Sequence, residues 1–167
     1  FAFDGYLYLV TRVQTWDVGL RVVDILSTPG CPVEVGSFRQ SGVTCVHAAR
    51  VGSARYAFLG GIGGVSMVDV TDPTQPVAVD HWSVPDKPCE VLGVFAEGAR
   101  VYAADWMSPG VWVLEIADPG TLAQVGFHST PDPRGIHVVG STAYVASGTA
   151  GAHVLDVSDP TAWRPLG

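Results

Sequence analysis

The chain has 167 residues, of which 47% are hydrophobic, with 20 Gly and 12 Pro. Its net charge of −7, with one Lys and eight Arg, argues against binding to a phosphate backbone, which needs clustered cations. No apolar run approaches the roughly 20 residues that a membrane-spanning helix needs. We therefore expect a packed domain with no nucleic-acid partner and no membrane span.

One short pattern occurs four times: an apolar strand that ends in an acidic residue and is followed by a turn. The acidic residues lie 45, 46 and 41 residues apart, at Asp24, Asp69, Glu115 and Asp156. Propeller blades are repeat units of this length, and each blade is a sheet of four strands. The spacing predicts an all-β fold, a β-propeller with about four blades of four-stranded antiparallel sheet.

Turn residues divide these blades into strands. Within one partial propeller domain we expect blades at about 1–39, 42–82, 87–128 and 134–167. In the second blade the predicted strands are 45–51, 56–60, 65–70 and 76–82. The first blade is expected to lack most of its inner strand and the last blade its outer strand. Open edges are unfavourable, so a larger ring is predicted, completed by further blades of a longer chain or by a second copy.

Asp-Pro pairs follow the third predicted strand of three blades. Pro73, Pro119 and Pro160 fix φ for a type I turn, and the preceding aspartate can accept hydrogen bonds from backbone amides two residues on. The acid three residues earlier can fasten the same hairpin. Recurrence in every blade favours a structural role for these acids over a catalytic one.

Three cysteines, Cys31, Cys45 and Cys89, show no CxxC spacing and so fit neither a zinc ribbon nor a dense disulfide framework. Cys45 and Cys89 lie 44 residues apart and should occupy similar places in consecutive blades. The spacing leaves open either a disulfide bridge, if their Cα atoms lie within about 7 Å, or two small core residues.

Three segments, GSTAYVASGTAGAHVLDVSDP, RYAFLGGIGGVSMVDVTDPTQP and RVYAADWMSPGVWVLEIADP, resemble LVIVD repeats. These repeats form propellers in bacterial and archaeal cell-surface and secreted proteins. The resemblance implies an extracellular or cell-surface scaffold, and it supplies no common reaction, no cofactor and no catalytic residues. The first residues, FAFDGYLYLV, hold no signal peptide, so we expect a leader already removed or a fragment.

In a propeller, the connections between the second and third strands, and those between blades, gather at one end. Tryptophans beside charged groups there would make a platform for a protein or carbohydrate ligand. The alternative is that Trp82 and Trp106 fill gaps between blades. The candidate ligand-binding residues at this end are Arg12, Trp16, Asp17, His81, Trp82, Asp105, Trp106, His128 and Arg134.

Two other functions stay open. His47 and His137 fall in predicted inner strands, with Glu90 in the strand between them, so a propeller enzyme could hold a metal or a small substrate in its central channel. A purely structural spacer is the third possibility. We favour a non-enzymatic binding module with no metal.

Overall fold

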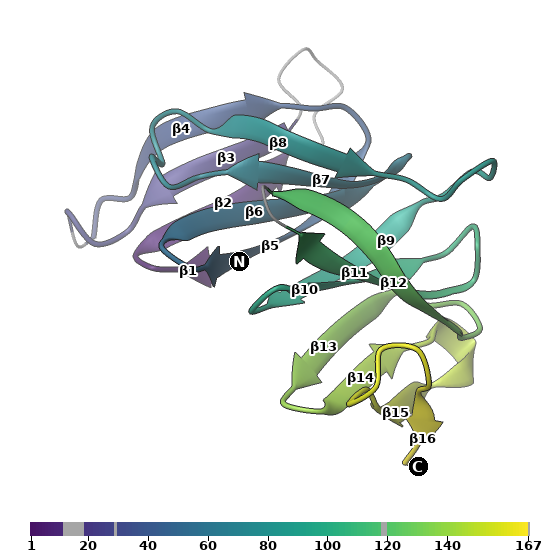
Figure 1. Cartoon of the computed structure of the whole chain (residues 1–167). Coiled ribbons are helices and arrows are strands. Elements are labelled where there is room, and N and C mark those ends of the chain that lie inside the picture. The colour runs from purple at the N-terminus through teal and green to yellow at the C-terminus, as the bar shows by residue number, and fades with distance from the viewer. Residues whose placement is uncertain (12–18, 29, 118–119, 167) are drawn as a thin grey trace.

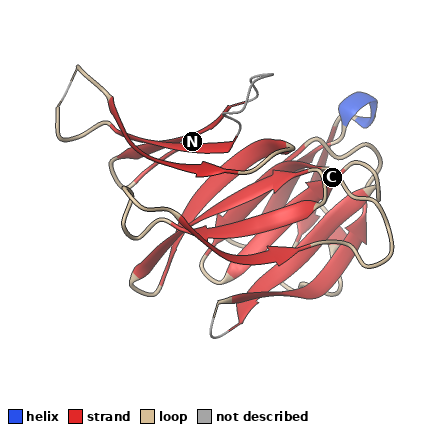
Figure 2. Cartoon of the chain, turned by 90° about the horizontal axis from the view of Figure 1, so that it is seen from above, coloured by secondary structure: helices blue, strands red, loops and turns tan. Residues whose placement is uncertain are grey.

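The computed structural model describes residues 1–11, 19–28, 30–117 and 120–166. These residues form four antiparallel sheets of four strands, each following the last along the chain (Figures 1 and 2). The strands of the first two sheets are β1 (Ala2–Phe3), β2 (Tyr6–Thr11), β3 (Gly19–Asp24), β4 (Val33–Arg39), β5 (Val43–Val51), β6 (Ala54–Gly61), β7 (Gly64–Asp69) and β8 (Val77–Trp82). Those of the last two are β9 (Val91–Glu97), β10 (Arg100–Asp105), β11 (Gly110–Ala117), β12 (Thr121–Ser129), β13 (Gly135–Val139), β14 (Thr142–Ala146), β15 (Ala152–Asp156) and β16 (Arg164–Pro165).

The strand order within each sheet is the order along the chain. Successive sheets pack through their inner strands: β2 lies against β5, β5 against β9, and β9 against β13 (Figure 1). The prediction of an all-β propeller of about four blades is confirmed. The last sheet ends on the two-residue β16, where we had expected no fourth strand. The described ranges contain no helix that could span a membrane.

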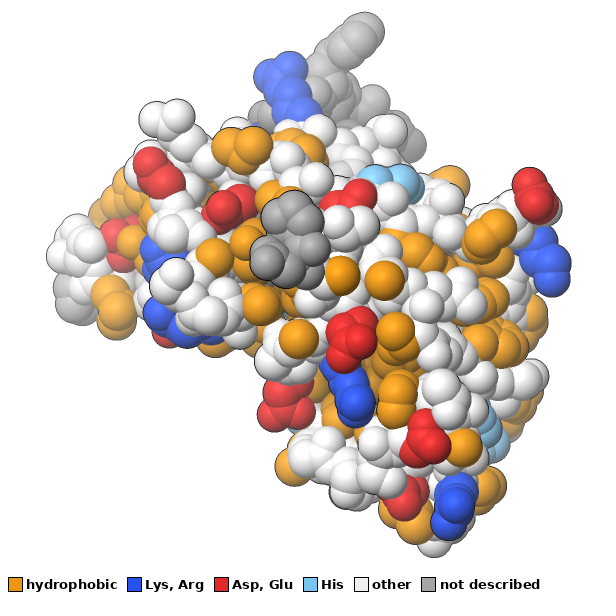
Figure 3. Space-filling model, viewed as in Figure 1, with side chains coloured by type: hydrophobic (Ala, Val, Ile, Leu, Met, Phe, Trp, Pro, Cys, Tyr) orange, Lys and Arg blue, Asp and Glu red, His pale blue; other side chains and the backbone are white. Residues whose placement is uncertain are grey.

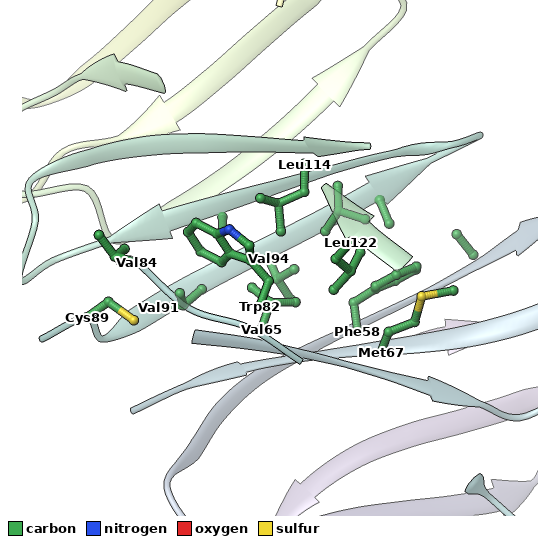
Figure 4. Close-up of a cluster of buried hydrophobic side chains, with 14 residues drawn as sticks. Phe58, Val65, Met67, Trp82, Val84, Cys89, Val91, Val94, Leu114 and Leu122 are labelled. Atoms are coloured by element: carbon green, nitrogen blue, oxygen red, sulfur yellow. The ribbon is translucent and has the colours of Figure 1, made fainter. Parts of the chain in front are cut away.

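Three apolar clusters fill the spaces between consecutive blades. The cluster between the second and third blades contains Phe58 and Met67 from one side and Leu114 and Leu122 from the other, beside Trp82 (Figure 4). A single twisted sheet leaves its apolar faces in water, so each blade depends on its neighbours for burial. Blade contacts along the arc therefore hold the fold together.

A β-bulge occurs at the same place in three outer strands. The register of the third and fourth strands shifts at Val22/Val23, Met67/Val68 and Val113/Leu114. After two of these bulges comes a glycine, Gly36 or Gly126, which lies against the carbonyl of Pro73 or Pro160 in the next blade's turn. A Cβ at either glycine would overlap that carbonyl, so these positions let neighbouring backbones approach closely.

The recurring acids fasten the hairpins between third and fourth strands, as predicted. Asp69 Oδ1 accepts a hydrogen bond from Thr71 N at 2.7 Å, and Asp156 Oδ1 accepts one from Ser158 N at 2.9 Å. Asp24 accepts from the Ser27 hydroxyl and from two backbone amides, which together lower the pKa of its carboxyl. These acids are structural in three of the four blades.

All three cysteines are free thiols, so of the two possibilities left open for Cys45 and Cys89 the structure shows two small core residues and no disulfide. Cys89 is buried in the cluster between the second and third blades, and the thiol of Cys45 donates a hydrogen bond to Val91 O at 3.7 Å. Burial raises the pKa of the Cys45 thiol to about 11. Both residues act as small core side chains.

Candidate functional site

One end of the propeller gathers the connections between second and third strands and those between blades, and we call it the loop face. Its segments are 40–42, 62–63, 83–90, 106–109, 130–134 and 147–151. Backbone hydrogen bonds join these segments: Gly63 N donates to Cys89 O of the next blade at 3.0 Å, and Ile62 N donates to Gly42 O within the second blade at 2.9 Å. These bonds give the loop face a defined shape although it contains little regular structure.

A groove of about 460 Å³ opens on the loop face between the second and third blades. Ile62 of the second blade and Met107 of the third, both exposed, line it. Its other lining residues are Gly63, His81, Ser83, Val84, Lys87, Pro88 and Cys89. Mostly apolar walls with a few polar groups are typical of sites that bind a ligand. Ile62, Lys87 and Met107 were missed by our sequence analysis, because irregular connections carry no periodic pattern.

Asp105 is fully buried beneath this groove. Its Oδ1 accepts hydrogen bonds from the backbone of Glu90 at 2.9 Å and of Met107 at 3.0 Å. Its Oδ2 accepts one from Trp112 Nε1 at 3.2 Å. The carboxylate therefore fixes the two segments that border the groove, and it is placed to position them.

His81 and Trp82 lie side by side at the end of β8 but have different surroundings. His81 lines the groove, where its Nε2 donates to Gly63 O at 3.2 Å and its Nδ1 accepts from the Ser66 hydroxyl at 2.9 Å. Trp82 is buried, and its ring lies 5.6 Å from that of Trp112. Trp82 thus fills the space between two blades, whereas His81 is available to a ligand.

Trp106 and Arg134 meet beside the groove. The Trp106 side chain is exposed, and the Arg134 guanidinium lies 5.8 Å from its ring centre, within the range of a cation–π contact. Arg134 Nε also donates to Asp132 Oδ1 at 2.7 Å. An exposed indole held by a cation from the next blade offers a flat apolar surface to a partner.

His128 is the last of the predicted ligand-binding residues that the structure describes. The ring of His128, on β12, stacks on Trp163 at 5.3 Å, and burial together with nearby His153 lowers its pKa. Arg12, Trp16 and Asp17 fall outside the described residues. On the face drawn in Figure 3, acidic and basic side chains are interspersed with apolar ones.

A row of rings in tilted or edge-on contact runs along the inner strands, and we call it the ring ladder. It comprises Phe1, His47, Phe95 and His137, one from each blade, with successive ring centres 4.0, 4.6 and 4.7 Å apart. Each residue lies opposite an aromatic residue of the next strand; these partners are Tyr8, Phe58, Tyr102 and Tyr144. The four ladder positions are therefore equivalent.

A cavity of about 370 Å³ borders the ring ladder and is also lined by Arg50 and Glu97. Phe95 stands between His47 and His137, and Glu90 lies at the loop face, where it pairs with Ile62. His47 Nδ1 accepts a hydrogen bond from Ala96 N at 3.2 Å. Among the described residues, no three His, Cys, Asp or Glu side chains are grouped to hold a metal.

Four consecutive sheets that pack face to face through their inner strands define the class of the protein as a β-propeller. The family model for the LVIVD repeat matches two regions, residues 3–40 and 132–164, so our recognition of LVIVD repeats is confirmed. No curated protein matches the chain.

Solved structures share the fold at low sequence identity. A Lactobacillus plantarum protein superposes with a TM-score of 0.69 at 17% identity, over 98% of this chain and 55% of its own. A putative 6-phosphogluconolactonase from Bacteroides uniformis gives 0.70 at 13% identity, over 98% of this chain and 53% of its own. The chain thus spans about half the length of these two structures, and at such identities the likeness concerns the fold alone.

Proposed function

We propose that the chain is a non-enzymatic binding module of an exported or cell-surface protein, which recognises a protein or carbohydrate through its loop face. The observation that carries this proposal is the groove lined by Ile62 and Met107, with exposed Trp106 on the same face. Apolar and aromatic side chains beside a few polar groups are suited to protein and sugar ligands. Placement at the cell surface rests on the resemblance to LVIVD repeats.

A binding screen tests the proposal. The purified chain is applied to an oligosaccharide array and to a phage-displayed peptide library, and each ligand found is titrated by calorimetry. Met107→Asp and Ile62→Asp each place a charge in its lining and should weaken binding at least tenfold. Val77→Asp, on the exposed start of β8 away from the loop face, is the matched control. Failure to find a ligand, or equal affinity for all variants, would contradict the proposal.

The rival proposal, an enzyme with a metal or small substrate in the channel, has less support. Its three residues do not converge, because Phe95 separates the two histidines and Glu90 lies at the loop face. Metal analysis of the purified protein with thermal shifts after chelation separates the two proposals. A stoichiometric metal whose removal lowers Tm would favour the enzyme.

We also propose that the four blades belong to a larger ring. The first and fourth blades each expose a face of the kind that the others bury. Further blades of the same polypeptide or a second copy would cover these faces, and either would leave the loop-face groove accessible.

A further inference from the structure

The cavity of about 370 Å³ beside the ring ladder belongs to the wall of the central channel. Its lining comes from β1, β5, β9 and β13 and from residues directly next to them in the chain, and the innermost strands of a propeller surround its channel. The lining includes Gly98, in the hairpin after β9, at the opposite end of that strand from the loop face. The cavity shares no residue with the loop-face groove, so it is a separate candidate site.

The central part of this cavity lies on the two middle blades, each of which has a blade on either side in the described chain. His47 and Phe95 contribute rings to it, and Ala49 and Ala96, both buried, contribute methyl groups. An apolar cavity of about 150 Å³ can hold benzene, so a volume of about 370 Å³ has room for two fused rings. The size and the aromatic lining are typical of a site for a small apolar molecule.

The charged side chains at this cavity disfavour an ionic ligand. Among the described residues that line it, the acidic and basic ones apart from the ladder histidines are Arg50 and Glu97. Arg50 is paired with Asp4, and Glu97 is exposed at the end of β9, where its carboxylate would repel an anion. A cation would have to give up its hydration among apolar walls. An uncharged ligand is therefore favoured.

His47 supplies a hydrogen-bond donor to the cavity. Its Nδ1 accepts a hydrogen bond from Ala96 N at 3.2 Å, and burial lowers the pKa of the ring to about 4, so at neutral pH the ring is uncharged and its proton is on Nε2. Among the described residues this Nε2–H has no acceptor, and Nε2 is not one of the buried atoms left without a partner. The N–H is therefore open to an acceptor on a ligand.

We propose that this cavity binds an uncharged aromatic molecule of one or two fused rings, which carries an oxygen acceptor such as a carbonyl for His47 Nε2. The apolar lining packs against the rings of the ligand, and the hydrogen bond from His47 fixes its orientation. The two middle blades carry these groups whatever the size of the complete ring. The site is also independent of the loop-face ligand, so either proposal can fail without the other.

Titration of the ¹⁵N-labelled chain with coumarin, an uncharged molecule of two fused rings with a carbonyl group, tests the site. The amide shifts measured by NMR should saturate and be largest at residues 48–50 and 96–98. The Ala96 amide is a direct reporter, because it donates to His47. Amides of the loop-face groove, such as those of Gly63 and Met107, should not shift. No saturable binding up to the solubility limit of coumarin, or shifts centred on the groove, would overturn the proposal.

A variant and two related probes test the chemistry of the site. His47→Phe keeps a ring but removes the N–H, so it should weaken coumarin binding about two- to tenfold without weakening that of naphthalene, which has no acceptor. Val77→Asp, exposed on β8 and outside the cavity, is the control and should bind coumarin like the wild type. The anion 2-naphthoate should bind more weakly than coumarin.

Equal affinity of the wild type and His47→Phe for coumarin, or tighter binding of 2-naphthoate than of coumarin, would contradict the proposal. If His47→Phe fails to fold, the map of amide shifts in the wild type still decides, because it needs no variant.

Discussion

Asp80 in β8 accepts a hydrogen bond from the backbone amide of Leu122 in the next blade, with an Oδ2–N distance of 2.6 Å. Asp80 follows the bulge in the second blade, where the first and third blades have Gly36 and Gly126. Leu122 stands where the second blade has Pro76, which lacks an N–H. Asp80 thus accepts a hydrogen bond from the N–H of Leu122, a group that a proline at this position would lack. The acid in place of glycine and the leucine in place of proline therefore compensate each other.

The hydrogen bond between Asp80 and Leu122 predicts that substitutions at these two positions are coupled in their effect on the free energy of unfolding. Asp80→Gly leaves the buried amide of Leu122 without a partner and should lower the free energy of unfolding by about 1–3 kcal/mol. In the Leu122→Pro background the same change removes no hydrogen bond and should cost less. Urea unfolding of both single variants and the double variant gives the coupling energy. Strict additivity would mean that the hydrogen bond contributes nothing.

The bulge glycines predict steric sensitivity at the outer strands. Gly36→Ala would bring a Cβ into overlap with Pro73 O, and we expect a loss of about 1–3 kcal/mol from strain. Gly135→Ala is the control, because the nearest atom, Ala146 Cβ, lies 4.0 Å from the added Cβ and Gly135 has no positive φ. Equal thermal stability of Gly36→Ala and Gly135→Ala would contradict the close packing of the Pro73 turn against Gly36.

Substitutions of Asp105 and Trp106 should have different effects, because Asp105 positions the segments of the groove and Trp106 is exposed to a ligand. Asp105→Ala leaves the Glu90 and Met107 amides and the Trp112 indole without their acceptor, so Tm should fall clearly. Trp106→Ala removes an exposed ring and should leave Tm nearly unchanged while weakening loop-face binding. Thermal unfolding and calorimetry measure the two effects. A large loss of stability in Trp106→Ala would argue that the indole is structural.

His47 predicts an acid-sensitive stability. Burial, with smaller effects from His137 and the N-terminal amine, lowers its pKa from 6.5 to about 4. Between these values the unfolded chain binds a proton that the folded chain does not, so stability falls as the pH drops from about 6.5 to 4; because His47 is partly exposed and screened by solvent, the loss should stay below about 3 kcal/mol. Below that range the lowered carboxyl pKa values of Asp24 and Asp156 cause a further loss.

His47→Phe, which keeps a ladder ring, should flatten the decline between pH 6.5 and 4 in urea titrations. An unchanged slope in His47→Phe would assign the acid sensitivity to other groups.

The three thiols should react in a fixed order. Cys31 is exposed, whereas burial raises the pKa of Cys45 to about 11 and also raises that of Cys89, and the thiolate is the reactive form. Iodoacetamide labelling of the native protein, followed by peptide mass spectrometry, should modify Cys31 first and the others only in denaturant. Rapid native labelling of Cys45 would mean that the blades open readily.

The blades were predictable because each must place an apolar strand, an acid and a turn at the same spacing, and Asp69 and Asp156 function as that pattern indicated. The ring ladder was hidden because hairpin lengths differ: His47 pairs with Phe58 across a longer hairpin than the one joining Phe95 to Tyr102. The groove was hidden because the placement of Ile62 and Lys87 depends on contacts between blades, which leave no local sequence pattern.

Because of Asp80, at the bulge of the second blade, the order of the blades limits which rearrangements of the repeats can fold. If recombination deleted the third blade, Asp80 would face the turn of the fourth, where Gly126 now accommodates the Pro160 carbonyl. Two oxygen acceptors would then meet without a donor between them. Duplication of the whole gene keeps each blade beside its partner. A rearranged chain that lacks the third blade would need a new hydrogen-bond donor for Asp80 to fold well.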